Sequence, residues 1–221
     1  MPATRPEPGI LQGRYIRLEP LTPELLPELH GAIGHPEVFA GGYGGGPAGY
    51  RATVDEFVEW GKGYYQWEGG NAYVIRLVGG RNDGTLVGTT TLGDIDPARE
   101  SVHIGWTAYD PRVWGTVVNP EAKLLLLGLA FDNGFGRVKI QADVLNLRSR
   151  AAIAKLGATF EGILRRDLPR ADGTWRDSAV FSIIIDEWPA VRAGLLERVE
   201  NQGGGVPVEF ARPPGAAESF D

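Results

Sequence analysis

Seven stretches of the chain alternate or concentrate apolar residues in the way that β-strands do. They are residues 14–21, 72–78, 85–92, 101–108, 137–144, 159–168 and 178–185. The turn sequences Asn82-Asp-Gly and Asp96-Pro-Ala-Arg separate the second, third and fourth stretches. Because short turns of this kind join neighbouring antiparallel strands, these three stretches predict an antiparallel meander.

Between these strands the apolar residues recur at helical spacing. The spacing predicts helices over residues 22–33, 53–65, 119–133, 148–156 and 187–199. Thr53 and Glu56 form a capping-box signature at the start of the second helix, and Gly157 stands just past the end of the fourth. The elements run in the order βαα-βββ-αβ-αββ-α, so we predict a mixed α+β fold with a mostly antiparallel sheet of about seven strands.

The two ends of the chain are rich in glycine and proline, whereas no long linker interrupts the middle. Clusters such as Gly203-Gly-Gly and Pro213-Pro-Gly fall in the last part of the sequence. We therefore expect a flexible N-terminal segment over residues 1–11, one domain over residues 12–199, and a flexible Gly/Pro-rich tail over residues 200–221.

Composition excludes several classes of function. The 22 Lys and Arg residues against 28 Asp and Glu residues give a net charge of −6, which disfavours nucleic acid as a partner. The chain has no cysteine, so disulfides, thiolate ligands and a cysteine nucleophile are all excluded. Its three histidines form no metal-binding motif. No export signal or membrane-spanning run is visible, so we expect a soluble, cytoplasmic protein without a metal.

The most informative segment is residues 109–123, which joins a strand to a long apolar helix. The N-terminus of a helix offers unpaired N–H groups and a partial positive charge, so a phosphate or diphosphate would fit near Gly115. An ordinary turn would also place a glycine at Gly115 and a capping asparagine at Asn119, and the spacing alone does not choose between these interpretations. The phosphate-loop motifs G-x-x-x-x-G-K-[ST] and G-x-G-x-x-G are both absent.

Within this segment, Arg112-x-x-Gly115-x-Val117 resembles the R/Q-x-x-G-x-G/A acyl-CoA loop of the GNAT (Gcn5-related) N-acetyltransferase family. Further stretches are similar to the ribosomal-protein N-terminal acetyltransferases, the RimJ/RimL-like branch of that family. They are Asn146-x-x-Ser149, Lys155-Leu-Gly-Ala, Glu161-Gly-Ile-Leu-Arg, Asp172-Gly with Arg176-Asp177, and Asp186-Glu-Trp-Pro. The resemblance spans residues 12–196 and implies the GNAT fold, in which two strands splay apart at the acyl-CoA site.

The resemblance also implies acetyl-CoA as co-substrate. The residues that it assigns to coenzyme A binding are Arg112, Trp114, Gly115, Thr116, Val117, Asn119 and Asn146. Val117 departs from the family loop, which most often has Gly or Ala there. A β-branched residue is strained at positive φ, so either the loop has an ordinary φ at Val117 and only some contact is lost, or cofactor binding is weakened. We expect Val117→Gly to tighten binding of acetyl-CoA.

The resemblance implies that an amine attacks the thioester directly in a ternary complex. Such a reaction needs a neutral amine, a hydrogen-bond donor to the carbonyl oxygen and a proton donor to the departing thiolate. By the resemblance, Ser149 is that proton donor, and the tyrosine of other GNAT branches is here Ile153. Ser149 and Asn146 could equally serve only as residues of a helix start, Asn146 as its cap.

Two residues are candidates for the general base. His103 has a side chain whose pKa range suits proton transfer near neutral pH, and the strand pattern places it opposite the apolar face that includes Trp106. Related sequences often have glutamate at this place, and a purely structural histidine fits as well. Asp167 is near the place of a carboxylate in some ribosomal-protein acetyltransferases. A water chain to solvent, with no dedicated base, is an equal alternative.

The leading interpretation is an acetyl-CoA-dependent N-acetyltransferase whose acceptor is a protein N-terminus or a small-molecule amine. A second interpretation is a non-catalytic acyl-CoA-binding module with the same fold. A nucleotide- or RNA-binding protein is disfavoured by the charge. Among the aromatic residues of the N-terminal part, only the loop tyrosines Tyr43 and Tyr50 suggest contacts to the acceptor. The sequence does not distinguish a monomer from a homodimer.

Overall fold

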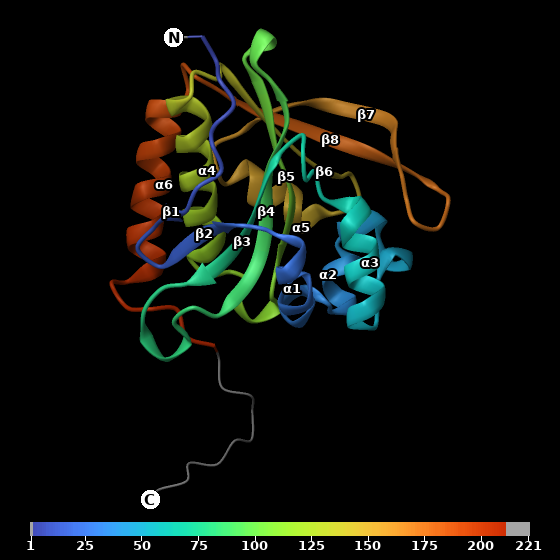
Figure 1. Ribbon diagram of the computed structural model, residues 1–221. Helices are drawn as coiled ribbons and strands as arrows, with labels where there is room; N and C mark the ends of the chain where they lie inside the picture. The colour runs from blue at the N-terminus through green and yellow to red at the C-terminus, as the bar shows by residue number, and fades with distance from the viewer. Residues whose placement is uncertain (1, 211–221) are drawn as a thin grey trace, which may run out of the picture.

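A computed structural model of the chain describes residues 2–210. Its strands form one sheet in the order β1-β2-β3-β4-β5-β6-β8-β7, in which only β5 and β6 are parallel (Figure 1). The strands are β1 (Leu11–Gln12), β2 (Ile16–Pro20), β3 (Asn71–Leu77), β4 (Leu86–Asp96), β5 (Ser101–Tyr109), β6 (Arg137–Asp143), β7 (Thr159–Pro169) and β8 (Trp175–Ile184). The mixed, mostly antiparallel fold is confirmed, and the two-residue β1 makes eight strands instead of the expected seven.

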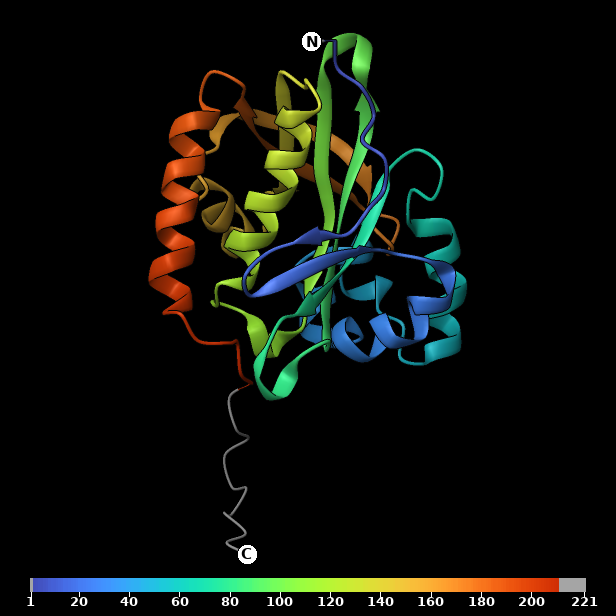
Figure 2. The ribbon, with the colours of Figure 1, turned by 60° about the vertical axis from the view of Figure 1, so that its left-hand side comes forward.

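Helices cover both faces of this sheet, as the two views in Figures 1 and 2 show. Six α-helices lie in the described chain: α1 (Leu26–Ile33), α2 (Pro36–Ala40), α3 (Val54–Tyr64), α4 (Val118–Asp132), α5 (Leu147–Ala154) and α6 (Trp188–Gly203). The predicted capping box of Thr53 and Glu56 is present at the start of α3.

The sheet separates two apolar cores. On one face α4, α5 and α6 pack on the sheet through residues such as Leu126, Ile153 and Leu195. On the other face α1, α2 and α3 pack on it through a second cluster that includes Leu29 and Phe57. Burial of these side chains holds both layers on the sheet, at about 25 cal/mol for each Å² of apolar surface removed from water.

The parallel strands β5 and β6 are paired over only part of their length. Ser101 to Ile104 pair with Arg137 to Ile140, and no described residue of β6 pairs with the rest of β5. The two strands therefore part at Ile104, on the side of the sheet where β5 leads into α4. This confirms the expected splay of two strands, and the loop to α4 and helix α5 follow the ends of the two strands that part.

Both ends of the described chain contact the domain rather than extend from it. Near the N-terminus, Arg5 donates to the Gly70 carbonyl at 2.9 Å. Residues 200–210, expected as the start of a flexible tail, continue α6 to Gly203 and then fold back, with Val208 buried and Glu209 paired with Arg81 at 2.5 Å. Residues 211–221 of the predicted tail lie outside the described residues.

Candidate active site

Several backbone N–H groups of the loop between β5 and α4 have no hydrogen-bond acceptor in the described chain. The amides of Gly115, Val117 and Asn119 have no hydrogen-bond partner among residues 2–210. Gly115 has φ +78°, and a Cβ built on it would meet nothing within 4 Å. A glycine is therefore needed for the backbone turn, and the space beside it is open to an anion at the positive end of α4.

Val117 does not strain this loop. Its φ is −64° and its ψ is −16°, which any residue adopts, and its side chain is only 1% exposed. Of the two alternatives for Val117, the structure therefore has the ordinary φ, and the positive φ falls on Gly115 instead. The valine side chain packs in the core beneath α4 and leaves its N–H toward the opening.

Asn119 is not the cap of α4. The helix starts one residue earlier, at Val118, and has no side-chain cap. The Asn119 side chain instead accepts a hydrogen bond at 2.9 Å from the hydroxyl of Tyr109 at the end of β5. Thr116 belongs to the loop between these two residues in the sequence. Its hydroxyl donates to the Val113 carbonyl at 2.7 Å, and this hydrogen bond stabilises the turn.

The Arg112 guanidinium is engaged with a carboxylate. It donates to both oxygens of Asp110, at 3.0 Å from Nε and 2.5 Å from Nη2. Asp110 is fully buried, whereas the Arg112 side chain is 52% exposed and lies 4.0 Å from the Phe210 ring centroid. The structure therefore shows a structural ion pair at Arg112, and only its exposed edge can reach a ligand.

Trp114 contacts a residue that the sequence did not single out. The guanidinium carbon of Arg148 lies 3.7 Å from its ring centroid, and the indole Nε1 donates to the Tyr109 carbonyl at 3.0 Å. Such a cation–π pair contributes about 0.5 to 1 kcal/mol when exposed. Arg148 belongs to the first turn of α5, so this pair links the two sides of the opening between β5 and β6.

Asn146 caps α5, as one of the two sequence interpretations expected. Its Oδ1 accepts the N–H of Ser149 at 2.9 Å, and its Nδ2 donates to the Gly41 carbonyl. The Ser149 hydroxyl is half-buried and has no hydrogen-bond partner among the described residues. The capping contact uses the Ser149 backbone, so its hydroxyl stays available for chemistry.

His103 forms a buried pair with a carboxylate that comes from the neighbouring strand. Its Nδ1 lies 3.0 Å from Oδ2 of Asp94, and Lys139 Nζ lies 3.4 Å from the same oxygen. Burial lowers the pKa of His103, and the hydrogen bond from His103 lowers the pKa of Asp94 well below its usual range. The imidazole is therefore neutral at pH 7, with Nδ1–H donated to Asp94.

The other ring nitrogen, Nε2, is buried without a hydrogen-bond partner in the described chain. A Cβ on Gly105 would stand 3.0 Å from it, so the glycine at this point leaves room for the ring. Gly105 is the first residue of β5 beyond its pairing with β6. The basic nitrogen of His103 thus lies at the point where the strands part.

A β-bulge follows directly, and no pattern of residues along the chain indicated it. Thr89 pairs with Ala108 while Thr91 pairs with Gly105, so β5 holds one extra residue here. Trp106 takes φ +49°, and its ring lies 5.4 Å from that of His103. The bulge brings Trp106 to the face of His103, contrary to the alternation expected, and it interrupts the regular pairing of β5 with β4.

Asp167 is turned inward by a second irregularity. Arg166 before it has φ +53°, and its N–H donates to Asp177 at 2.7 Å. Oδ2 of Asp167 is buried without a partner among the described residues, while the neighbouring Leu168 is 39% exposed. No hydrogen bond joins Asp167 to His103 or Ser149 in the described chain.

A family model described as "Acetyltransferase (GNAT) domain" matches residues 16–159. The chain belongs to the GNAT acetyltransferase family. A GCN5-related N-acetyltransferase from Brucella melitensis is 29% identical, with 95% of each chain covered and a TM-score of 0.80. No curated protein matches the chain in sequence.

Two more distant structures share the fold. RimJ of Mycobacterium smegmatis, in complex with CoA-disulfide, is 21% identical over 86% of this chain and 91% of its own, with a TM-score of 0.62. The microcin C7 self-immunity acetyltransferase MccE, in complex with acetyl-CoA and AMP, is 22% identical over 80% of this chain and 97% of its own, with a TM-score of 0.65. The family model thus confirms the resemblance to the GNAT family, and these two structures share its fold.

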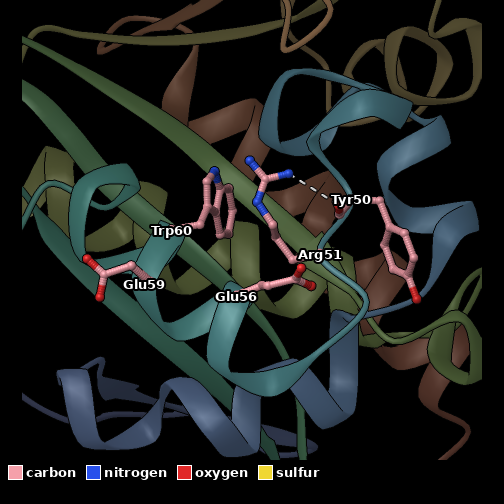
Figure 3. Close-up of a pocket in the computed structure, with 5 residues that line it drawn as sticks. All are labelled: Tyr50, Arg51, Glu56, Glu59 and Trp60. Carbon is pink, nitrogen blue, oxygen red and sulfur yellow. Dashed lines mark hydrogen bonds between the residues drawn. The ribbon is translucent and has the colours of Figure 1, made fainter.

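The two loop tyrosines of this GNAT domain differ in accessibility. Tyr43 is buried, with its hydroxyl 2.5 Å from that of Tyr65, so it forms part of the core. Tyr50 lines an open hollow of about 510 Å³ on the outer side of α3. Figure 3 shows its five lining side chains: Tyr50, Arg51, Glu56, Glu59 and Trp60. Of the two tyrosines, Tyr50 alone is placed to meet a ligand from solvent.

Residues 2–210 contain neither a metal-site cluster nor a helix that could span a membrane. No group of three or more His, Asp or Glu side chains there has the arrangement of a metal site. None of the helices there is long and apolar enough to cross a membrane.

Proposed function

We propose that this GNAT protein is an acetyl-CoA-dependent N-acetyltransferase that moves an acetyl group to a primary amine by direct attack in a ternary complex. The acceptor is a protein N-terminal α-amine or a small-molecule amine. The observation that carries the proposal is the end of the pairing between β5 and β6 after Ile104, on the strand that leads to α4. Two further features belong to the same strand and the loop after it: the unpaired amides at the start of α4 and the buried, unpartnered Nε2 of His103.

Coenzyme A fits this opening in its charge and in its shape. The amides of Gly115, Val117 and Asn119 suit the diphosphate, since a helix N-terminus binds anions. The gap beyond Ile104 suits the narrow pantetheine arm, which would run between the two strands. RimJ binds CoA-disulfide and MccE binds acetyl-CoA in structures of the same fold, which supports this placement.

The acetyl transfer then needs three groups of this chain. The nitrogen of the acceptor attacks the thioester carbon, and its proton passes to Nε2 of His103, which Asp94 holds in the required tautomer. The carbonyl oxygen gains charge, and backbone amides of the bulge at Trp106 stabilise it. The carbon–sulfur bond breaks, and the Ser149 hydroxyl donates a proton to the leaving sulfur. The proton held by His103 then returns to Ser149 through water, so the products are the amide and coenzyme A and both side chains are restored.

His103 is the favoured base because its free nitrogen is buried, neutral and next to the opening. Asp167 is the second candidate, since its Oδ2 is also buried without a partner in the described chain. An α-amine, with a pKa near ~8, needs less help from a base than a lysine amine near ~10.4. A weak base such as a neutral imidazole therefore favours α-amines as acceptors.

The experiment is the release of coenzyme A from acetyl-CoA in the presence of a panel of amines. Peptides with free N-termini, lysine-containing peptides with blocked N-termini, and small amines should be compared. We expect release that depends on the acceptor and is fastest with an α-amine. Binding of acetyl-CoA by calorimetry without turnover of any amine would instead support the non-catalytic binding module.

A further inference from the structure

Lys123 is a buried amine in the second turn of α4 that faces the sheet. It is only 5% exposed, and no carboxylate of the described chain lies within 4 Å of it. Its Nζ donates to Thr107 Oγ1 at 3.1 Å and lies 3.5 Å from Thr90 Oγ1. Burial lowers the pKa of this amine to about 7. An apolar side chain would avoid the cost of removing an amine from water, so stability alone does not explain a lysine here.

The hydrogen bonds around Lys123 fix the direction of each donor. Thr107 Oγ1 donates to the Gly105 carbonyl at 3.2 Å, which uses its only proton. Thr90 Oγ1, at 2.8 Å from Thr107 Oγ1, must therefore donate to it. Thr107 can then accept from Lys123 as well, so the lysine enters the network as a donor.

This network surrounds the β-bulge. Thr90 lies between Thr89 and Thr91, the two residues of β4 whose partners on β5 mark the extra residue. Gly105 and Thr107 flank Trp106, whose positive φ is a strained backbone conformation for a residue other than glycine. Among the described residues of α4, Lys123 alone forms a hydrogen bond to the strained segment from Gly105 to Thr107.

We propose that Lys123 is a positioning residue for acetyl transfer: through Thr107 it holds the bulge of β5 in the conformation that turns a backbone amide there toward the carbonyl oxygen of the thioester. This inference rests on the proposed function. In this proposal the first turn of α4 binds the diphosphate. About one helical turn further along, Lys123 of the same helix positions the backbone that stabilises the charge on the carbonyl oxygen. Both ends of the co-substrate are then aligned by one rigid element.

The test replaces Lys123 and its partner with side chains of similar shape. Lys123→Met keeps the volume and removes the donor, Thr107→Val removes the hydroxyl, and Thr107→Ser restores it. Lys62→Met, at an exposed lysine of α3 paired with Glu59, is the matched control. Each variant is first checked for its free energy of unfolding, which we expect Lys123→Met to leave unchanged or to raise.

Two readouts distinguish positioning from a merely structural role. We expect kcat to fall about tenfold or more in Lys123→Met and Thr107→Val, with KM for acetyl-CoA changed less than about twofold, and Thr107→Ser to recover most of the rate. We also expect the infrared band of the isotope-labelled thioester carbonyl, in bound acetyl-CoA without acceptor, to move to higher wavenumber in Lys123→Met. The double variant Lys123→Met, Thr107→Val should be no slower than either single variant.

The outcomes separate this inference from the proposed function. A wild-type kcat and an unmoved carbonyl band in Lys123→Met would overturn the role of Lys123. If the wild type binds acetyl-CoA but acetylates no amine, the transfer reaction fails, and the carbonyl band alone still decides for or against Lys123. If the wild type does not bind acetyl-CoA, both proposals are wrong.

Discussion

The guanidinium of Arg148 lies on the ring of Trp114, with 3.7 Å between the guanidinium carbon and the ring centroid. Trp114 follows the end of β5, and Arg148 follows the end of β6. The pair therefore connects the two strands just beyond the point where they part. It places a permanent positive charge beside the proposed path of coenzyme A.

Arg148→Ala should weaken binding of coenzyme A, because it removes this charge from beside the opening. We expect Kd to rise about fivefold to tenfold, equal to a loss of about 1 kcal/mol. Calorimetric titration at two salt concentrations measures it, and the difference from wild type should shrink at the higher salt. Arg192→Ala, at an exposed arginine of α6, is the control. Equal Kd values for Arg148→Ala and wild type would show that Arg148 takes no part in binding.

Val117→Gly should destabilise the fold and should not tighten cofactor binding. The valine is buried at φ −64°, so glycine relieves no strain, and the lost side chain costs about 2 kcal/mol in free energy of unfolding. Urea denaturation and titration with coenzyme A measure the two effects. Tighter binding by Val117→Gly would show that the side chain obstructs the cofactor.

Gly115→Ala tests the same loop at the residue whose backbone has a positive φ. At φ +78° an alanine is strained by about 1 to 2 kcal/mol, and its methyl group would enter the space proposed for the diphosphate. We expect both lower stability and a Kd for coenzyme A at least about tenfold higher. Gly173→Ala, which also replaces a glycine at positive φ (+84°) with open space beside it, should lower stability alone.

The pH dependence of kcat/KM should report the pair of His103 and Asp94. Because burial lowers the pKa of His103, the neutral imidazole is present at pH 7 and is lost as pH falls through that lowered value. Asp94→Asn removes a carboxylate that stabilises the protonated ring, so the acidic limb of the profile should move to lower pH. Both profiles are measured with the same acceptor amine, so the titration of that amine does not contribute to the difference between wild type and Asp94→Asn.

His103→Ala should lower kcat by about a hundredfold or more, as expected for loss of a general base. His35→Gln is the control for replacing a histidine elsewhere. A normal rate in His103→Ala together with a slow Asp167→Asn would transfer the role of base to Asp167. Normal rates in both variants would favour a water chain.

Ser149→Ala and Asn146→Ala should separate chemistry from helix capping. Asn146 caps α5 through the Ser149 N–H, which alanine keeps, so Ser149→Ala should keep the stability of wild type and lower kcat about tenfold or more. Asn146→Ala removes the cap and should cost about 1 kcal/mol in free energy of unfolding. Loss of stability in Ser149→Ala without loss of kcat would leave the serine a structural role only.

Local patterns predicted most of the strands, most of the helices and the capping of α3 and α5, because these depend on residues close together in sequence. The positions around the site that were missed depend on pairing between distant segments. The bulge at Trp106 is visible only in the register of β4 and β5, and Asp94 reaches His103 only because a hairpin joins those strands. Arg148 meets Trp114 across the parting of two strands, a contact with no signature in sequence.

The same limit explains the errors at single residues. Asn119 resembles a helix cap by its type and by the proline after it, yet Val118 precedes it in α4 and Tyr109 binds its side chain. The terminal segments have the composition of flexible tails, whereas Val208 and Arg5 are held by contacts to distant parts of the domain. Composition records the cost of ordering a segment but not the contacts that offset it.

The most direct test of the account is a crystal structure of the chain with acetyl-CoA bound. We predict diphosphate oxygens within hydrogen-bond distance of the amides of Gly115, Val117 and Asn119, the pantetheine arm between β5 and β6, and the thioester beside the bulge at Trp106, on the side open to His103 Nε2. Acetyl-CoA bound away from this opening, with the amides before α4 still unpaired, would contradict the account.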